Sequence, residues 1–146
     1  AGRAGLPERA QGGCLSCDRP RLGGAYDVPH GETSCAALPA VLAWNARDAR
    51  TLPRQQLVRD VFLELARERG GDAAAREAGG LSAAEHVRGL VRELGLPGSL
   101  AEVGVVGREQ LEDCAHRTMQ DRLVASNPRP ISDWRDVLEI LELAAE

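Results

Sequence analysis

The sequence contains no lysine and few aromatic residues. All 18 basic residues are arginine, and Phe, Trp and Tyr together make up 3% of the 146 residues. There are 22 acidic residues, so the net charge is −4, and the two signs are mixed along the chain. A nucleic-acid-binding protein needs a basic surface against the phosphates, and aromatic side chains that stack on bases. We therefore expect no nucleic-acid partner.

Long hydrophobic runs and an export signal are also missing. No apolar run approaches the roughly 20 residues that span a bilayer. The N-terminus does not show the charged region and apolar core of a secretory signal. These absences predict a cytoplasmic protein without a membrane partner. The four cysteines, Cys14, Cys17, Cys35 and Cys114, are then expected to be reduced thiols.

The composition favours an all-α fold. Hydrophobic residues make up 43% of the chain and are mostly Leu, Val and Ala, whereas the residues that favour strands are scarce. We predict a compact multi-helix domain over residues 25–146. Residues 1–24 contain six glycines and show no regular period, so they are predicted to be an irregular N-terminal segment.

Hydrophobic periodicity predicts five or six helices joined by short turns. The first begins at Glu32 and contains Pro39, which is expected either to kink the helix or to lie in its first turn. The second covers 54–69, ends at the glycine pair 70–71, and is followed by a weaker helix at 73–78. The apolar stripe predicted for the second helix consists of Leu57, Val58, Val61, Phe62 and Leu65.

The later helices are marked by capping residues. Ser82 and Glu85 form a capping-box pattern before a helix that ends at Gly95. The residues expected to be buried on that helix are Val87, Leu90, Val91 and Leu94. One further helix is predicted within 107–124. After an Asn-Pro-Arg-Pro turn, Ser132 is the expected N-cap of the last helix.

The three histidines are candidate functional residues. His30 lies in a predicted loop between glycines, so it is either a solvated loop residue or a metal ligand, because neutral imidazole binds zinc and iron well. His86 and His116 lie on predicted helices and are interpreted as surface residues. The glutamates interpreted as a solvated face of the last helix are Glu139, Glu142 and Glu146.

Several motifs together resemble the C-terminal half of the iron-containing alcohol dehydrogenase superfamily. They are Leu-Gly-Gly-Ala-Tyr-Asp at 22–27, Pro-His-Gly-Glu-Thr at 29–33, Leu-Pro at 38–39, Trp-Asn at 44–45, Leu-Gly-Leu-Pro at 94–97 with Ser-Leu at 99–100 and Gly104, and Asn-Pro-Arg-Pro at 127–130. The resemblance extends from Leu22 to Glu146. The Glu-Thr pair that follows His30 is most similar to the maleylacetate reductases of this superfamily.

This resemblance implies the helical domain of an NAD(P)H-dependent oxidoreductase. It implies hydride exchange between NAD(P)H and a small carbonyl or enoic-acid substrate, in a cleft beside an N-terminal α/β domain that binds the dinucleotide. In metal-dependent members an aspartate and three histidines hold iron or zinc, which polarises the substrate oxygen. His30 matches the last of these histidines. A maleylacetate reductase would act in the catabolism of aromatic compounds.

The chain departs from the family pattern before Leu22. The family has a His-x-x-x-His pair there, and the corresponding positions are Ser16 and Pro20. The remaining ligands and the phosphate-binding loop would precede Ala1. One ligand of four does not make a stable site. We therefore expect an incomplete part of a larger oxidoreductase, inactive alone, with poor metal binding, no cofactor-binding residue and no assigned catalytic residue.

Two alternatives stay open at this stage. Cys14, Cys17, His30 and Cys35 follow an order that could enclose a structural zinc ion in a small zinc-stabilised domain. The chain could instead be a non-catalytic helical interaction module. An uncovered apolar surface on an isolated helical domain would favour association, for example into a homodimer.

Overall fold

The computed structural model describes residues 29–146, and all regular secondary structure in this range is helical. The helices are α1 (His30–Asn45), η1 (Ala49–Thr51), α2 (Leu52–Ala78), α3 (Ala83–Glu93), α4 (Arg108–Thr118), η2 (Arg122–Ser126) and α5 (Trp134–Ala145), where η denotes a 3-10 helix. The all-α prediction is confirmed. The irregular segment predicted for 1–24 lies outside the described residues. Within residues 29–146, no helix is long and apolar enough to cross a membrane.

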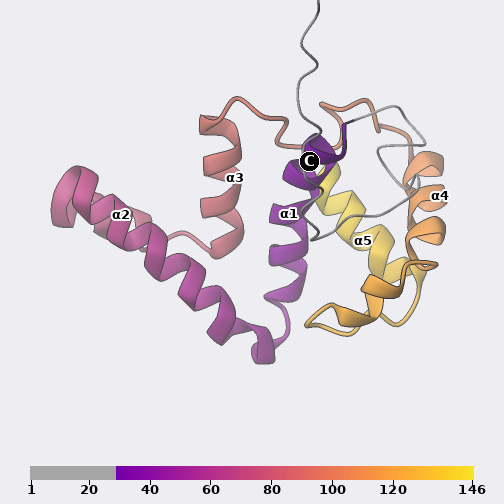
Figure 1. Cartoon of the computed structure of the whole chain (residues 1–146), viewed down its shortest axis with the longest axis horizontal. Helices are drawn as coiled ribbons and strands as arrows, with labels where there is room; N and C mark the ends of the chain where they lie inside the picture. The colour runs from indigo at the N-terminus through magenta and orange to yellow at the C-terminus, as the bar shows by residue number, and fades with distance from the viewer. Residues whose placement is uncertain (1–28) are drawn as a thin grey trace, which may run out of the picture.

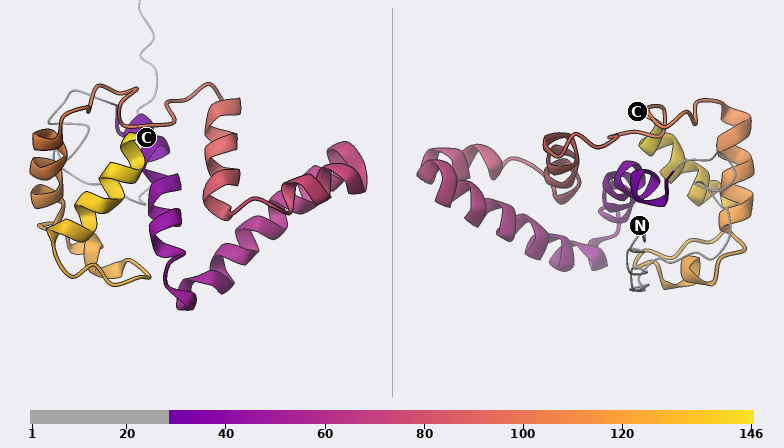
Figure 2. Two further views of the ribbon diagram at one scale, coloured as in Figure 1. Left: turned by 180° about the vertical axis from the view of Figure 1, so that it is seen from behind. Right: turned by 45° about the horizontal axis from the view of Figure 1, so that its top comes forward.

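Helix α1 lies at the centre of the molecule (Figure 1). It packs against α3 on one side and against α5 on the other, and α4 covers α5. Helix α2 packs mainly on α3 and projects away from the other helices, as both views in Figure 2 show. The chain therefore builds a helical body from α1, α4 and α5, with α2 and α3 attached beside it.

The main hydrophobic core lies inside this body. Its buried members are Ala36, Ala40, Trp44, Leu100, Val105, Leu111, Cys114, Ala115, Val137, Leu138, Ile140, Leu141 and Ala144. They come from α1, α4, α5 and the connection before α4, and none belongs to α2 or α3, both of which the structure describes in full. Cys114 is fully buried among these residues.

Helix α1 begins two residues earlier than predicted. It starts at His30 and continues beyond Pro39, which therefore lies in its interior and not in its first turn. Ala36, Ala40 and Trp44 recur at intervals of four and form its buried face. The small side chains of the two alanines allow close helix packing, and the buried indole of Trp44 is the largest side chain of the core.

The predicted break in α2 is confirmed, and part of its predicted apolar stripe faces solvent. Gly71 has a positive φ of 71° inside the helix, and the segment after it continues to Ala78. Two residues of the predicted apolar stripe, Leu57 and Val61, are each 65% exposed. Among the described helices, α3 is the long helix that packs most closely against α2, so one side of α2 is covered.

The start of α3 agrees with its sequence, whereas its buried face is narrower than predicted. The Ser82 hydroxyl accepts a hydrogen bond from the backbone N–H of Glu85, whose carboxylate accepts one from the backbone N–H of Ser82. Val91 is buried as predicted, but Leu90 and Leu94 are 40% and 64% exposed. The helix ends before Gly95, which has a φ of 68°.

Two predicted boundaries in the C-terminal part are wrong. Helix α4 ends at Thr118, and η2 follows it in place of a continuous helix, because the Asp121 side chain accepts a hydrogen bond from Leu123 N–H and starts a new turn. The N-cap of α5 is Asp133 and not Ser132. Asp133 accepts from the backbone N–H of Arg135 at 2.6 Å, which satisfies one of the free donors at the helix start.

Candidate functional site

His30, the residue predicted as a metal ligand, is the first residue of α1 and is exposed. Pro29 precedes it and makes no side-chain cap. The hydroxyls of Thr33 and Ser34 both donate to the backbone carbonyl of His30, at 3.0 and 2.8 Å. These bonds fix the first turn and leave the imidazole on the surface, where it could contact a ligand or another domain.

The described residues do not fit a complete iron or zinc site around His30. Within 29–146 no group of three or more His, Cys, Asp or Glu side chains is close enough to hold a metal ion. The family-pattern positions Ser16 and Pro20 lie outside the described residues. His30 can therefore supply one donor, whereas a stable site needs three or four.

The alternative four-ligand zinc site receives little support from helix geometry. Cys14 and Cys17 lie outside the described residues. His30 and Cys35 are both in α1, five residues apart, so they are separated by about 7.5 Å along the axis and about 140° around it. Two donors of one tetrahedral zinc ion lie within roughly 4 Å of each other. This placement does not favour a shared zinc ion.

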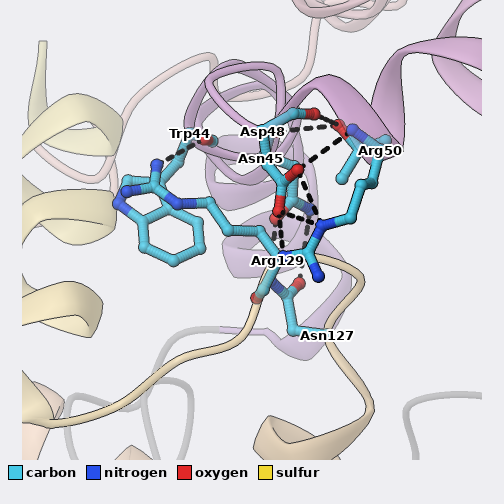
Figure 3. Close-up of polar contacts among 7 residues, drawn as sticks. Trp44, Asn45, Asp48, Arg50, Asn127 and Arg129 are labelled. Carbon is cyan, nitrogen blue, oxygen red and sulfur yellow. Dashed lines mark hydrogen bonds and ion pairs between the residues drawn. The ribbon is translucent and has the colours of Figure 1, made fainter.

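Two motifs that are far apart in the sequence meet at the end of α1 (Figure 3). The side-chain amides of Asn45 and Asn127 donate to each other, with N–O distances of 3.3 and 2.7 Å. Arg129 lies over the Trp44 ring, with its guanidinium carbon 3.7 Å from the ring centroid, and donates to the Trp44 carbonyl at 2.8 Å. The Trp-Asn and Asn-Pro-Arg motifs thus tie the chain before α5 to the end of α1.

Glu139 of α5 belongs to the same group of contacts. It accepts a 2.8 Å hydrogen bond from the indole N–H of Trp44 and forms an ion pair with Arg47. Arg47 and then Trp44 lower the pKa of the Glu139 carboxyl below its usual value. The Glu139 side chain is 44% exposed, as expected for a solvated face, and it also accepts a hydrogen bond from a buried donor. No period in the sequence could have shown this contact, which joins residues 95 positions apart.

Asp48 fixes the turn that follows α1. Its carboxylate accepts hydrogen bonds from the backbone and the guanidinium of Arg50, and these bonds, the side-chain one first, lower its pKa to about 2. Next to it, the Thr51 hydroxyl donates to the carbonyl of Asn45 at 2.7 Å. The cluster at the end of α1 is thus fully hydrogen-bonded, and its chemistry is that of a structural junction.

His86 lies between α2 and α3, and its interpretation as a surface residue is wrong. It is 7% exposed and stacks on Phe62 with ring centroids 4.8 Å apart and the rings nearly parallel. Its Nε2 has no hydrogen-bond partner among the described residues. Burial, and then the nearby charge of Arg59, lower the pKa of His86 below 6.5. His116, in contrast, is exposed as predicted and stacks on Trp134.

A family model described as "Fe-containing alcohol dehydrogenase family, C-terminal" matches residues 19–145. The match begins before Pro20 and after Ser16. A curated relative, dehydrogenase FUM7 from Gibberella moniliformis, is 51% identical over 41 residues, which is 27% of this chain. The aligned part covers only 10% of that dehydrogenase. No solved structure shows significant similarity to the chain.

Proposed function

The chain belongs to the Fe-containing alcohol dehydrogenase family, and on this premise we propose that it is the helical substrate- and metal-side domain of an NAD(P)H-dependent oxidoreductase. The observation that carries the proposal is the family match over 19–145, which includes every described helix. The complete enzyme would exchange hydride between NAD(P)H and a small carbonyl or enoic acid. The dinucleotide would bind to an α/β domain, and the helical chain alone would be inactive.

Maleylacetate reductase is the type that we propose within this family. The supporting residues are Glu32 and Thr33, which follow His30. Thr33 is buried and bonded to the His30 carbonyl, so its role is to shape the first turn of α1. Glu32 and His30 are the polar groups of that turn that remain accessible to a substrate or to a second domain.

We propose His30 as a metal-side residue and derive no metal-dependent step, because no group of three or more donor side chains lies together within residues 29–146. When iron or zinc is bound in this family, the ion acts as a Lewis acid on the substrate oxygen. The other donors would have to come from outside residues 29–146. A cytoplasmic location and the absence of a nucleic-acid partner remain predictions.

A domain chimera tests this proposal. Residues 22–146 would replace the equivalent domain of a maleylacetate reductase, so that the donor supplies the α/β half and the upstream ligands. We expect the chimera to oxidise NADH or NADPH with maleylacetate, and the 146-residue chain to show no such activity. Replacing His30 with Ala in the chimera should lower kcat/KM by roughly 100-fold, as expected for loss of a metal ligand or its support. A matched substitution of the exposed His116 should leave kcat/KM unchanged.

Two results would contradict the proposal. Hydride transfer by the isolated chain would show that it is not an incomplete part. A chimera that folds and binds NADH but reduces neither maleylacetate nor short aldehydes would limit the family relationship to ancestry. The second candidate function, a non-catalytic interaction module, would then be favoured, because α2 extends from the body with an exposed apolar side.

A further inference from the structure

One side of α2 carries a row of residues that no other helix of residues 29–146 covers. Arg54, Leu57, Val61, Leu65 and Glu68 are separated by three, four, four and three residues. At about 100° per residue, all five lie within an arc of about 80° around the helix. We call this row the α2 flank. Leu57 and Val61 are each 65% exposed, Arg54 and Glu68 are exposed, and Leu65 is partly exposed.

The α2 flank is separate from the side of α2 that packs on α3. The packed side contains Phe62, which stacks on His86, and Arg59, which donates to the carbonyls of Gly79 and Leu81. Figures 1 and 2 show α2 extending from the helical body, with only α3 beside it. Leu57, Val61 and the partly exposed Leu65 form a continuous apolar row on consecutive turns, and continuous exposed apolar surface is typical of interaction sites.

The α2 flanks of two copies of the chain are complementary when the two helices run antiparallel. The row is symmetric in position about Val61. Leu57 and Leu65 lie four residues before and after it, and Arg54 and Glu68 lie seven residues before and after it. An antiparallel pair of α2 helices with a twofold axis at Val61 would place Arg54 opposite the partner's Glu68. A parallel pair in register would place arginine against arginine and glutamate against glutamate. In the described part of the chain, neither Arg54 nor Glu68 has an ion-pair partner of its own.

We propose that the α2 flank is the interface of a homodimer, in which two copies of α2 pair antiparallel about an axis at Val61. The interface is isologous, so each complementary pair occurs twice. The row runs from Arg54 to Glu68, or about 21 Å of helix, which makes a small contact. The dimer is therefore weak and depends on concentration. This proposal does not rest on the oxidoreductase function.

Sedimentation equilibrium of the 146-residue chain over a range of concentrations tests the dimer. The wild type should change from 15.6 kDa at low concentration toward twice that mass at high concentration. V61E should remain monomeric throughout, because two carboxylates would meet on the axis without water. V106E is the matched control: Val106 is 71% exposed in the connection before α4, so the same change there should leave the dimer intact.

Charge reversal tests the register. R54E and E68R should each weaken the dimer roughly 3- to 10-fold, because each replaces two opposite-charge contacts with two like-charge contacts. The double variant R54E/E68R should regain the wild-type dissociation constant. As a second measurement, V61C should yield, on oxidation, a disulfide-linked peptide pair that joins position 61 of two copies.

The proposal has clear contrary results. A wild-type chain that stays monomeric at every concentration overturns it, and a partner other than this chain would then cover the α2 flank. A dimer that persists in V61E and gives no crosslink at position 61 uses another surface. If the double charge reversal remains as weak as the single ones, the antiparallel register is wrong. Should V61E lose helix content, the crosslink and the charge reversals decide the question.

Discussion

Trp44 shows how a single buried side chain organises its surroundings. It is fully buried, yet its indole N–H must find an acceptor, and Glu139 supplies it from α5. Arg129 covers the ring and binds the Trp44 carbonyl, which joins the Asn-Pro-Arg turn to α1. Two of the motifs in the family resemblance, Trp-Asn and Asn-Pro-Arg, therefore have a structural reason to occur together.

Replacing Glu139 with Ala should lower the free energy of unfolding by about 1–3 kcal/mol, because a buried N–H donor loses its acceptor. Glu142 is the matched control on the same helix. Its contact with Arg108 is a solvent-exposed ion pair, so the Glu142→Ala change should have an effect below about 1 kcal/mol. The free energies of unfolding of both variants are compared by urea unfolding monitored by circular dichroism. Equal losses in the two would show that Glu139 is only a surface charge.

His86 should make the stability of the protein depend on pH near neutrality. Its pKa is lowered in the folded chain, chiefly by burial, whereas in the unfolded chain it is near 6.5. As pH falls through 6.5, the unfolded chain takes up a proton that the folded chain resists. The stability present at higher pH is therefore lost progressively, until the folded pKa is reached.

The His86→Leu variant should lose less stability than the wild type between about pH 7.5 and 5. Urea unfolding at several pH values measures the difference. The His116→Gln variant controls for the removal of one exposed histidine and should keep the wild-type pH dependence in this interval. If His86→Leu and the wild type have parallel curves, proton uptake at His86 is not coupled to folding.

At the scale of the elements, helix starts are decided by which polar side chain reaches the free backbone N–H groups. Ser82 and Glu85 do this for α3 in the way that their sequence pattern predicts. For α5, Ser132 and Asp133 are both good capping residues by type, and the chain uses Asp133. Asp136 completes the cap by accepting from the backbone N–H of Ser132 at 2.7 Å.

Asp133→Ala should destabilise the protein by about 1 kcal/mol, because α5 loses its N-cap. Ser132→Ala should change the stability by less than about 0.5 kcal/mol, since the Ser132 side chain is exposed and only its backbone is used. Thermal or urea unfolding of the two variants compares adjacent positions in the same turn. A larger loss in Ser132→Ala than in Asp133→Ala would assign the cap to Ser132.

At the scale of the whole molecule, stability is distributed unevenly. The core joins α1, α4 and α5, whereas Gln55 and Ala75 are the buried residues of the 27-residue helix α2. Gly71 interrupts α2, and the segment beyond it carries exposed charges such as Arg76. A region with few buried apolar contacts opens at a lower free-energy cost than the core does.

Hydrogen exchange should therefore separate the two parts of the fold. In the monomeric V61E variant, backbone amides of α2 beyond Gly71 should exchange first, followed by the rest of α2. Amides of α1 and α5 should exchange last, near the free energy of global unfolding. Mass spectrometry of peptic fragments measures the order. Equal protection of the amides of α2 and α5 would contradict the division into a stable helical body and a less stable α2.

The sequence alone determined the helical class, the capping box at Ser82, the break at Gly71 and the motifs that mark the family, because composition, local hydrogen bonding and backbone strain act over a few residues. The tertiary structure decided which apolar faces are covered. Leu57 and Leu94 belong to apolar periods in the sequence but are 65% and 64% exposed. His86 and Glu139, in contrast, contact Phe62 and Trp44 on other helices. Burial depends on the placement of other elements, and no local pattern contains that information.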